Sequence, residues 1–171
     1  MNLLKYPLDL SDIFSNSWLS GFTDADGNFN VIISLRKNLN SIRIQTQFRI
    51  ELRQTYHRKN LIKGYGITYW DILSIIANKL GINVYNRSRY LKESLTYQYY
   101  FVCSTISSKI LLRKYFDQFP LKSSKYLDYI DWCKIIDESQ NYNKKKEEII
   151  NNCKQIKNNM NNNRKYFNWD H

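Results

Sequence analysis

Residues 18–28 read WLSGFTDADGN, a stretch that decides the fold because it predicts a helix ending in two acids. Trp18, Leu19, Phe22 and Ala25 recur at helical spacing, and Gly27 is a natural stop. The two aspartates therefore fall in the last helical turn, at the negative end of the helix dipole. An anion there costs about 0.3–1 kcal/mol, and a lysine or arginine is the usual choice. We therefore expect another group to compensate the acids.

The hydrophobic period changes from 3.6 to 2 after this helix. Apolar side chains alternate with polar ones over residues 29–36 and again over residues 43–51, with the polar turn KNLNS between them. This alternation predicts a β-hairpin with one apolar face. Thr68 and Gly81 then bracket a helix whose apolar stripe is suited to cover that face.

A second pair of strands is predicted over residues 83–90 and 97–104. Tyr85, Arg87 and Arg89 share one side of the first of these strands, because side chains alternate along a strand. The facing of the second strand stays open.

Further helices follow the second strand pair. The first ends at Phe119, because the residue before a proline is pushed out of the helical region. Ser123 or Ser124 begins the next, and residues 144–156 favour one more. The order of elements predicts an α+β fold, and a length of 171 residues suits one domain.

Composition excludes several classes of protein. No apolar run approaches the roughly 20 residues of a membrane span, and the N-terminal stretch resembles neither a signal peptide nor a transit peptide. The three cysteines are odd in number and lack metal-ligand spacing, which indicates free thiols in a reducing compartment.

The chain is strongly basic, with a formal net charge of +11. Such an excess favours a polyanionic partner, nucleic acid first and an anionic membrane surface second. Part of the excess lies in the low-complexity stretch KNNMNNNRK at residues 157–165, which we expect to be solvated.

A row of polar side chains follows the first hairpin opposite its apolar face. Arginine pairs bidentately with guanine and glutamine or asparagine with adenine, and a two-stranded ribbon fits the major groove. An ordinary solvated sheet face is the alternative, but it would mix in more acids. The candidate nucleic-acid contacts are Asn30, Ser34, Arg36, Arg43, Gln45, Gln47 and Arg49, with Arg87 and Arg89 from the second strand pair.

Gly21 lies inside the first helix, where it costs about 1 kcal/mol relative to alanine. That cost makes sense if another backbone approaches there, and Ala25 supplies a second small residue one turn later. Two such helices paired about a two-fold axis would bring their terminal acids together. A divalent ion held by oxygen ligands would then compensate them, stabilise charge on a phosphate and activate water. From residues 24–27 alone, a plain turn is the simpler interpretation.

Three blocks, in order, resemble one family. LSGFTDADG at residues 19–27 resembles the signature of the LAGLIDADG homing endonucleases. FPLKSSKYLDY at residues 119–129 resembles the family's basic segment after the third helix, and RKYFNWDH at residues 164–171 resembles the ends of fungal mitochondrial intron-encoded members. The resemblance implies an αββαββα core with an antiparallel sheet and additional C-terminal helices. It divides the chain into an N-terminal extension or linker (1–14), a LAGLIDADG domain (15–140) and a helical, Asn/Lys-rich tail (141–171).

The resemblance also implies an activity, the site-specific cleavage of both strands of a double-stranded DNA target with magnesium (Mg2+). It gives Asp26 the metal-binding and catalytic role, Lys125 the role of stabilising the transition-state phosphate, and Asp24 a mainly structural role. It places the helix-pair interface at Leu19, Gly21, Phe22 and Ala25. By the same resemblance the protein is organelle-encoded and mitochondrial.

Leu52 departs from the family pattern. Many members carry a polar residue, often glutamine, at the matching position near the end of the second strand to order water. The departure favours an alternative function, an RNA maturase that binds its group I intron and assists splicing.

Assembly has two interpretations, a homodimer on a near-palindromic site or one half of a pseudo-symmetric protein. The opening YPLDLSDIFSNSWLSGF at residues 6–22 resembles the entry to the second half of two-motif members. We therefore favour a second-half ancestry, with pairing still required for cleavage.

Overall fold

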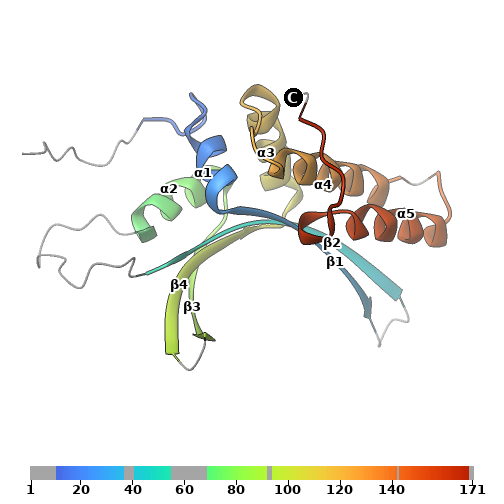
Figure 1. The fold of residues 1–171 in the computed structure, drawn as a ribbon, viewed down its shortest axis with the longest axis horizontal. Helices are drawn as coiled ribbons and strands as arrows, with labels where there is room; N and C mark the ends of the chain where they lie inside the picture. Colours follow the sequence, from blue (N-terminus) through green and yellow to red (C-terminus); the bar gives the residue numbers. More distant parts are fainter. Residues whose placement is uncertain (1–10, 37–40, 55–68, 92–93, 142, 170–171) are drawn as a thin grey trace, which may run out of the picture.

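The computed structural model describes residues 11–36, 41–54, 69–91, 94–141 and 143–169. Its four strands form one antiparallel sheet in the order β1-β2-β4-β3, and the helices lie on one side of it (Figure 1). The elements are α1 (Trp18–Asp26), β1 (Gly27–Arg36), β2 (Ser41–Arg53), α2 (Tyr69–Leu80), β3 (Val84–Leu91), β4 (Ser94–Cys103), α3 (Ile106–Gln118), α4 (Lys125–Ser139), α5 (Lys146–Asn158) and the short 3-10 helix η2 (Asn161–Asn163). This order confirms the predicted α+β fold with an αββαββα core and additional helices.

The predicted ends of α2 and α3 hold, whereas the helix predicted over residues 144–156 is shifted by two residues, to Lys146–Asn158. Gly81 closes α2 with a φ of +64°, and the Ile82 N–H donates to the Ala77 carbonyl at 2.9 Å. This is the left-handed cap that glycine adopts most easily. α3 ends at Gln118, two residues before the proline. The predicted cap at Thr68 and most of the KNLNS turn lie outside the described residues.

Cross-strand pairing fixes which side chains share a face of the sheet. Asn30 of β1 pairs with Gln47 of β2, while Arg53 of β2 and Arg87 of β3 both pair with Gln98 of β4. Directly opposed residues point to the same side of an antiparallel sheet. The register therefore decides the facing of β4, which the sequence leaves open: Gln98 lies on the polar face with the arginines.

The opposite face of the sheet carries an aromatic core. Phe48 lies at the centre, with its ring centroid 5.1 Å from that of Phe29 and 6.0 Å from that of Phe101. Trp132 of α4 packs against Phe29 at 5.5 Å and is fully buried. The helices therefore cover one face, and the other remains open.

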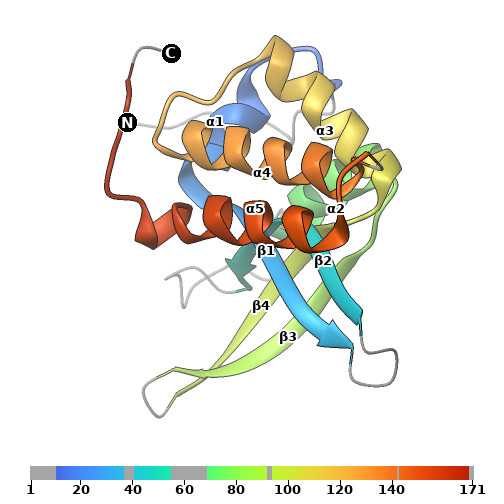
Figure 2. The same cartoon turned by 90° about the vertical axis from the view of Figure 1, so that its right-hand side faces the viewer.

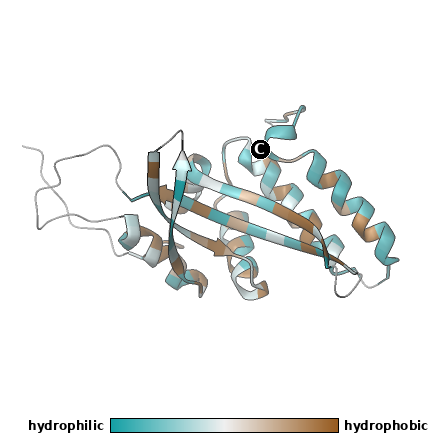
Figure 3. Ribbon diagram, turned by 90° about the horizontal axis from the view of Figure 1, so that it is seen from below, coloured by the Kyte–Doolittle hydropathy of each residue, from teal (hydrophilic) through white to brown (hydrophobic). Residues whose placement is uncertain are grey.

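The two hairpins diverge below the helical layer, so the open face forms an arch (Figures 1 and 2). Figure 3 looks onto this face, with the helices behind the sheet.

Most residues of the stretch 157–165 are exposed, as the sequence predicts, but the C-terminal tail as a whole packs against the rest of the chain. α5 packs against α4 and β2, and Ile150, Cys153 and Met160 are buried. Asn161 then donates its side-chain amide to the Phe29 carbonyl at 3.0 Å. Composition does not reveal these contacts, because a few apolar residues at helical spacing among the asparagines and lysines are enough to cover one side of a helix. The boundary near residue 140 stays a prediction.

The three cysteines of the chain are free and buried, as expected of free thiols. Within the described residues, no helix is both long enough and apolar enough to cross a membrane.

Candidate nucleic-acid interface and catalytic site

The end of α1 is bound to the segment that leads into α4. The Asp24 carboxylate accepts hydrogen bonds from the Lys122 N–H (2.8 Å), the Ser123 N–H (3.2 Å) and the Ser123 hydroxyl (2.6 Å). These N–H groups lie just before Ser124, the N-cap of α4, so the acid lies near the positive end of the helix dipole. Asp24 therefore has the contacts expected of an acid with a structural role.

Lys125 makes the reciprocal contact. It is the first residue of α4, and its Nζ donates to the Ala25 carbonyl (2.8 Å) and the Thr23 carbonyl (3.1 Å) in the last turn of α1. Burial lowers the pKa of Lys125 below the usual lysine value, while the neighbouring Asp26 and Asp24 carboxylates oppose that shift. A cation of the chain itself thus offsets the negative helix end that the sequence leaves uncompensated.

Asp26 differs from Asp24 in having its carboxylate free. The side chain is exposed and has no hydrogen-bond partner among the described residues. It borders a shallow pocket of about 320 Å³ on the open face of the sheet. The other residues that line this pocket are Asn28, Arg49, Glu51, Arg53, Arg89 and Gln98. Asp26 is therefore available to bind a cation next to a strongly basic surface.

Within the described residues, no group of three or more histidines, cysteines and acids converges as a metal site. One copy of the chain offers Asp26 alone as a free carboxylate at the end of α1. Hard divalent cations take several oxygen ligands. The donor set consequently fits such an ion only if a second helix contributes its own acid.

One face of α1 is largely exposed within the described residues, although Phe22 is half-buried and also packs against the core. Trp18 is 47% exposed and stacks on Phe22 with ring centroids 5.1 Å apart, and Ala25 is exposed on the same side. A Cβ built on Gly21 would meet no atom within 4 Å. We call Trp18, Gly21, Phe22 and Ala25 the α1 stripe. Leu19, which the sequence places in the helix-pair interface, is fully buried in the core of the chain itself and lies off this stripe.

All nine candidate nucleic-acid contacts lie on the open face of the sheet, as the pairing register shows. Sequence reasoning placed Glu51 on this polar side but gave it no role, and it missed Asn28, Arg53 and Gln98 on the same face. Asn28 lies two residues from Asn30 and Arg53 lies four residues from Arg49, so strand periodicity could have found both. Gln98 could not be found, because the facing of its strand is decided only by the register.

The side chain of Gln98 is buried on the open face of the sheet and carries an unpaired acceptor, Oε1. The side chain is 5% exposed, and its Nε2 donates to the Thr96 hydroxyl oxygen at 2.7 Å. That hydroxyl donates its own proton to the Arg89 carbonyl at 3.1 Å, so it must accept from Gln98. The orientation of the amide is thereby fixed, and Gln98 Oε1 is left without a hydrogen-bond partner in the described structure.

Leu52 points to the covered face of the sheet. It alternates with Glu51 and Arg53, is half-buried and packs against the hydrophobic core. The end of β2 therefore presents Glu51, and not an amide, on the side of Asp26.

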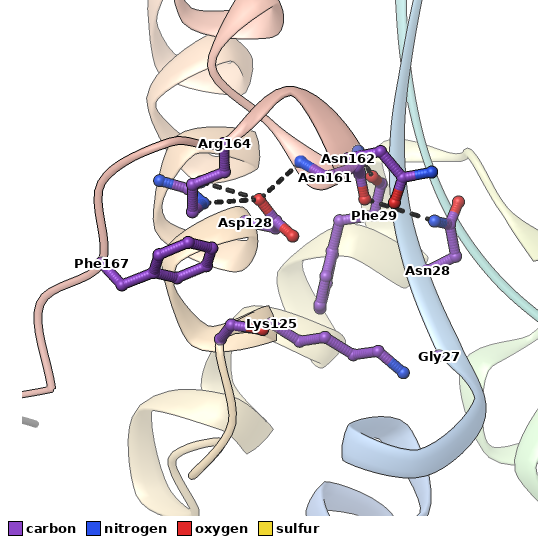
Figure 4. A pocket seen from close by; sticks show the side chains of 10 residues that line it. Gly27, Asn28, Phe29, Lys125, Asp128, Asn161, Asn162, Arg164 and Phe167 are labelled. Carbon is purple, nitrogen blue, oxygen red and sulfur yellow. Dashed lines mark hydrogen bonds and ion pairs between the residues drawn. The ribbon is translucent and has the colours of Figure 1, made fainter.

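A second pocket lies between the C-terminal tail, β1 and α4 (Figure 4). It has a volume of about 460 Å³ and is lined by residues of β1, α4 and the tail, including Phe167. Arg164 Nη2 donates to Asp128 Oδ1 and Asp131 Oδ2, both at 2.7 Å, and the Asn161 N–H donates to Asp128 Oδ1 at 2.9 Å. Arg164, which lines this pocket, is therefore paired with acids of α4, and these contacts hold the tail against that helix.

An αββαββα unit whose first helix ends in acids beside an open sheet face has the homing-endonuclease fold. A model of the LAGLIDADG endonuclease family matches residues 19–136, and the chain belongs to this family.

Relatives among known proteins agree with this assignment. The chain is 36% identical over 143 residues to the intron-encoded DNA endonuclease aI3 of Saccharomyces cerevisiae, which covers 79% of this chain and 34% of that protein. It is 32% identical over 136 residues to the uncharacterized cox1 intron-2 37.2 kDa protein of Schizosaccharomyces pombe, covering 78% and 35%. The chain thus spans about a third of the length of these relatives.

Solved structures share the fold. The homing endonuclease I-TnaI matches with a TM-score of 0.64 at 18% identity, over 84% of this chain and 86% of that one. The meganuclease I-SmaMI, bound to uncleaveable DNA, matches with a TM-score of 0.67 at 23% identity, over 91% of this chain but 47% of that one.

Proposed function

We propose that this chain is one half of a site-specific DNA endonuclease that makes a double-strand break by metal-dependent phosphodiester hydrolysis. The observation that carries the proposal is the open face of the sheet. Nine residues chosen for their chemistry share this arched surface, and the free carboxylate of Asp26 lies at the pocket on it. A basic concave sheet is suited to bind the major groove, with base contacts from arginine and glutamine.

Pairing of two halves is part of this proposal. The chain corresponds to nearly all of the I-TnaI chain but about half of the I-SmaMI chain. This difference supports a structural unit that functions as a pair, either as two chains or as two halves of one chain. The α1 stripe supplies an apolar surface with small residues for close helix packing. The partner is a second copy or a complementary LAGLIDADG half.

In such a pair, Asp26 from each half would hold Mg2+ between the two α1 ends. A bound divalent ion stabilises charge on a phosphate and activates water. Lys125 is held beside Asp26 by two backbone carbonyls, and its charge can offset negative charge that develops on the phosphate. Asp24 keeps α4, and with it Lys125, in place.

The test compares Asp26→Asn with the unaltered chain on the intron-lacking form of its host gene. The variant should lose magnesium-dependent cleavage and bind DNA within a few-fold of the unaltered protein, because Asp26 is exposed and unbonded. Glu147→Gln, an equal charge change on an exposed position of α5, is the matched control and should cleave normally. Cleavage by Asp26→Asn would refute the role of this acid.

The facing of Leu52 favours a second candidate function. An apolar side chain packed into the core cannot order water beside Asp26, whereas a basic binding surface does not depend on that water. In this alternative the chain is a maturase that binds its group I intron RNA and assists splicing. Binding and splicing of the intron transcript without cleavage of the intron-lacking DNA would establish it. In both cases we expect the protein to act in the mitochondrion.

A further inference from the structure

Glu51 is an acidic residue on a surface formed mainly by arginine and amide side chains. Among the strand residues that the structure describes, it is the only acid on the open face. Its side chain is 14% exposed, so the carboxylate is largely removed from water. A buried charge of this kind is costly unless it is paired and hydrogen-bonded.

Three arginines from two strands pair with this one carboxylate. Arg87 of β3 reaches across β4 and binds it with both Nε, at 2.8 Å, and Nη2. Arg89 Nη2 lies 3.4 Å from Oε2, and Arg49 Nη1 lies 3.7 Å from the same atom. Glu51 therefore ties the centre of the open face together.

The three arginines are held to different degrees. Arg87 is fixed on two sides, because its guanidinium also lies 4.8 Å from the centroid of the Tyr100 ring. A bidentate pair of this kind sets direction as well as energy. Arg49 and Arg89 each use one terminal nitrogen on Glu51, so other donors of their guanidinium groups stay available for a ligand.

A long arginine side chain without such a tether meets the nearest phosphate as easily as a base edge. Phosphate contacts strengthen binding to every sequence and carry no sequence information directly. A tether that fixes the arginine's direction, and whose charge repels phosphate, changes this balance in favour of the bases.

We propose that Glu51 is a positioning residue that determines sequence specificity, by holding Arg49 and Arg89 toward base edges and away from phosphates. The inference rests on the proposed DNA-binding function. Under this proposal Arg87 has a structural role in the surface, whereas Arg49 and Arg89 remain candidates for contacts with DNA bases.

The experiment first asks the full chain to select its preferred site from a synthetic duplex pool of randomised sequence. Affinity for that site and for random DNA is then measured at several salt concentrations for the unaltered chain, Glu51→Gln and Glu51→Asp. For Glu51→Gln we expect random-DNA affinity to rise and the specificity ratio to fall, each by about tenfold, because the freed arginines bind phosphates. The slope of log affinity against log salt on random DNA should steepen by about one for each additional phosphate that an arginine neutralises.

Glu51→Asp separates positioning from charge. It keeps the negative charge but is one methylene shorter, so we expect the specificity ratio to fall while random-DNA affinity stays the same. Glu147→Gln on α5 is the matched charge control and should leave the ratio unchanged. Thermal unfolding of each variant verifies that it is folded.

Each outcome decides a separate question. If the unaltered chain selects no sequence, the proposed DNA recognition itself fails. If it selects a site and both Glu51 variants keep the specificity ratio, Glu51 is not a positioning residue. A silent Glu51→Asp beside an affected Glu51→Gln would show that Glu51 acts by charge repulsion alone, which also overturns the proposal.

Discussion

Replacing Gly21 by leucine should strengthen the single chain and break its pairing. Gly21 lies in the middle of α1, and a Cβ there meets no atom within 4 Å. The free chain therefore gains the better helix propensity of leucine, about 0.7 kcal/mol, without a clash. For a domain of this size that gain raises the melting temperature by about 2 °C.

The paired helices would respond in the opposite direction. A leucine inserted at a close helix crossing overpacks it by about 1–3 kcal/mol, and a symmetric pair contains two such residues, which gives about 2–6 kcal/mol. Since about 1.4 kcal/mol changes an equilibrium constant tenfold, the dissociation constant of the pair should rise about 30-fold to 10⁴-fold. Cleavage should fail with pairing, because the two Asp26 carboxylates separate.

Sedimentation, thermal unfolding and a nicking assay measure the three effects. Asn151→Leu places the same side chain on an exposed position of α5 and should change neither pairing nor cleavage. A Gly21→Leu variant that is more stable, assembles normally and still cleaves would refute the paired-helix site.

Three other variants test separate contacts. Lys125→Met should lower the free energy of unfolding by about 1–2 kcal/mol, because two carbonyls of α1 lose their donor, and it should slow the single-turnover rate more than it weakens binding. Arg49→Ala should cost on the order of 1–3 kcal/mol on the selected site and little on random DNA, and equal losses on both would assign the arginine to phosphate. Arg164→Met should lower the free energy of unfolding by about 3 kcal/mol, because it leaves the buried Asp128 carboxylate without its cation. Lys165→Met, at the exposed neighbouring position, should be nearly silent in the same denaturant titration.

Periodicity determines most of the fold from the sequence alone. The change from a period of 3.6 to a period of 2 after α1 is a local property, as is the alternation that places Asn30, Gln47 and Arg49 on one side of a hairpin. The glycine stop at Gly81 and the break before the proline are local as well, since they depend on the φ and ψ of single residues.

Contacts between distant parts of the chain could not be read in this way. The sequence shows two acids at an unfavourable helix end, but only the tertiary structure brings Lys125, about a hundred positions later, to the carbonyls of that helix. The same holds for the tail, whose Asn- and Lys-rich composition suggests solvation until Met160 is found in the core. Composition averages over side chains, whereas burial depends on which few of them meet a surface.

The open face shows the division most clearly. Alternation along each strand is set by the sequence, because successive side chains point to opposite sides of any strand. How the strands are aligned is set by pairing across the sheet, and a shift of one residue would turn every side chain of a strand to the other face. The sequence by itself therefore determined the row of arginine and amide side chains along the first hairpin. Only the tertiary register decided that Gln98 lies on the same face and that Glu51 binds the arginines of two strands.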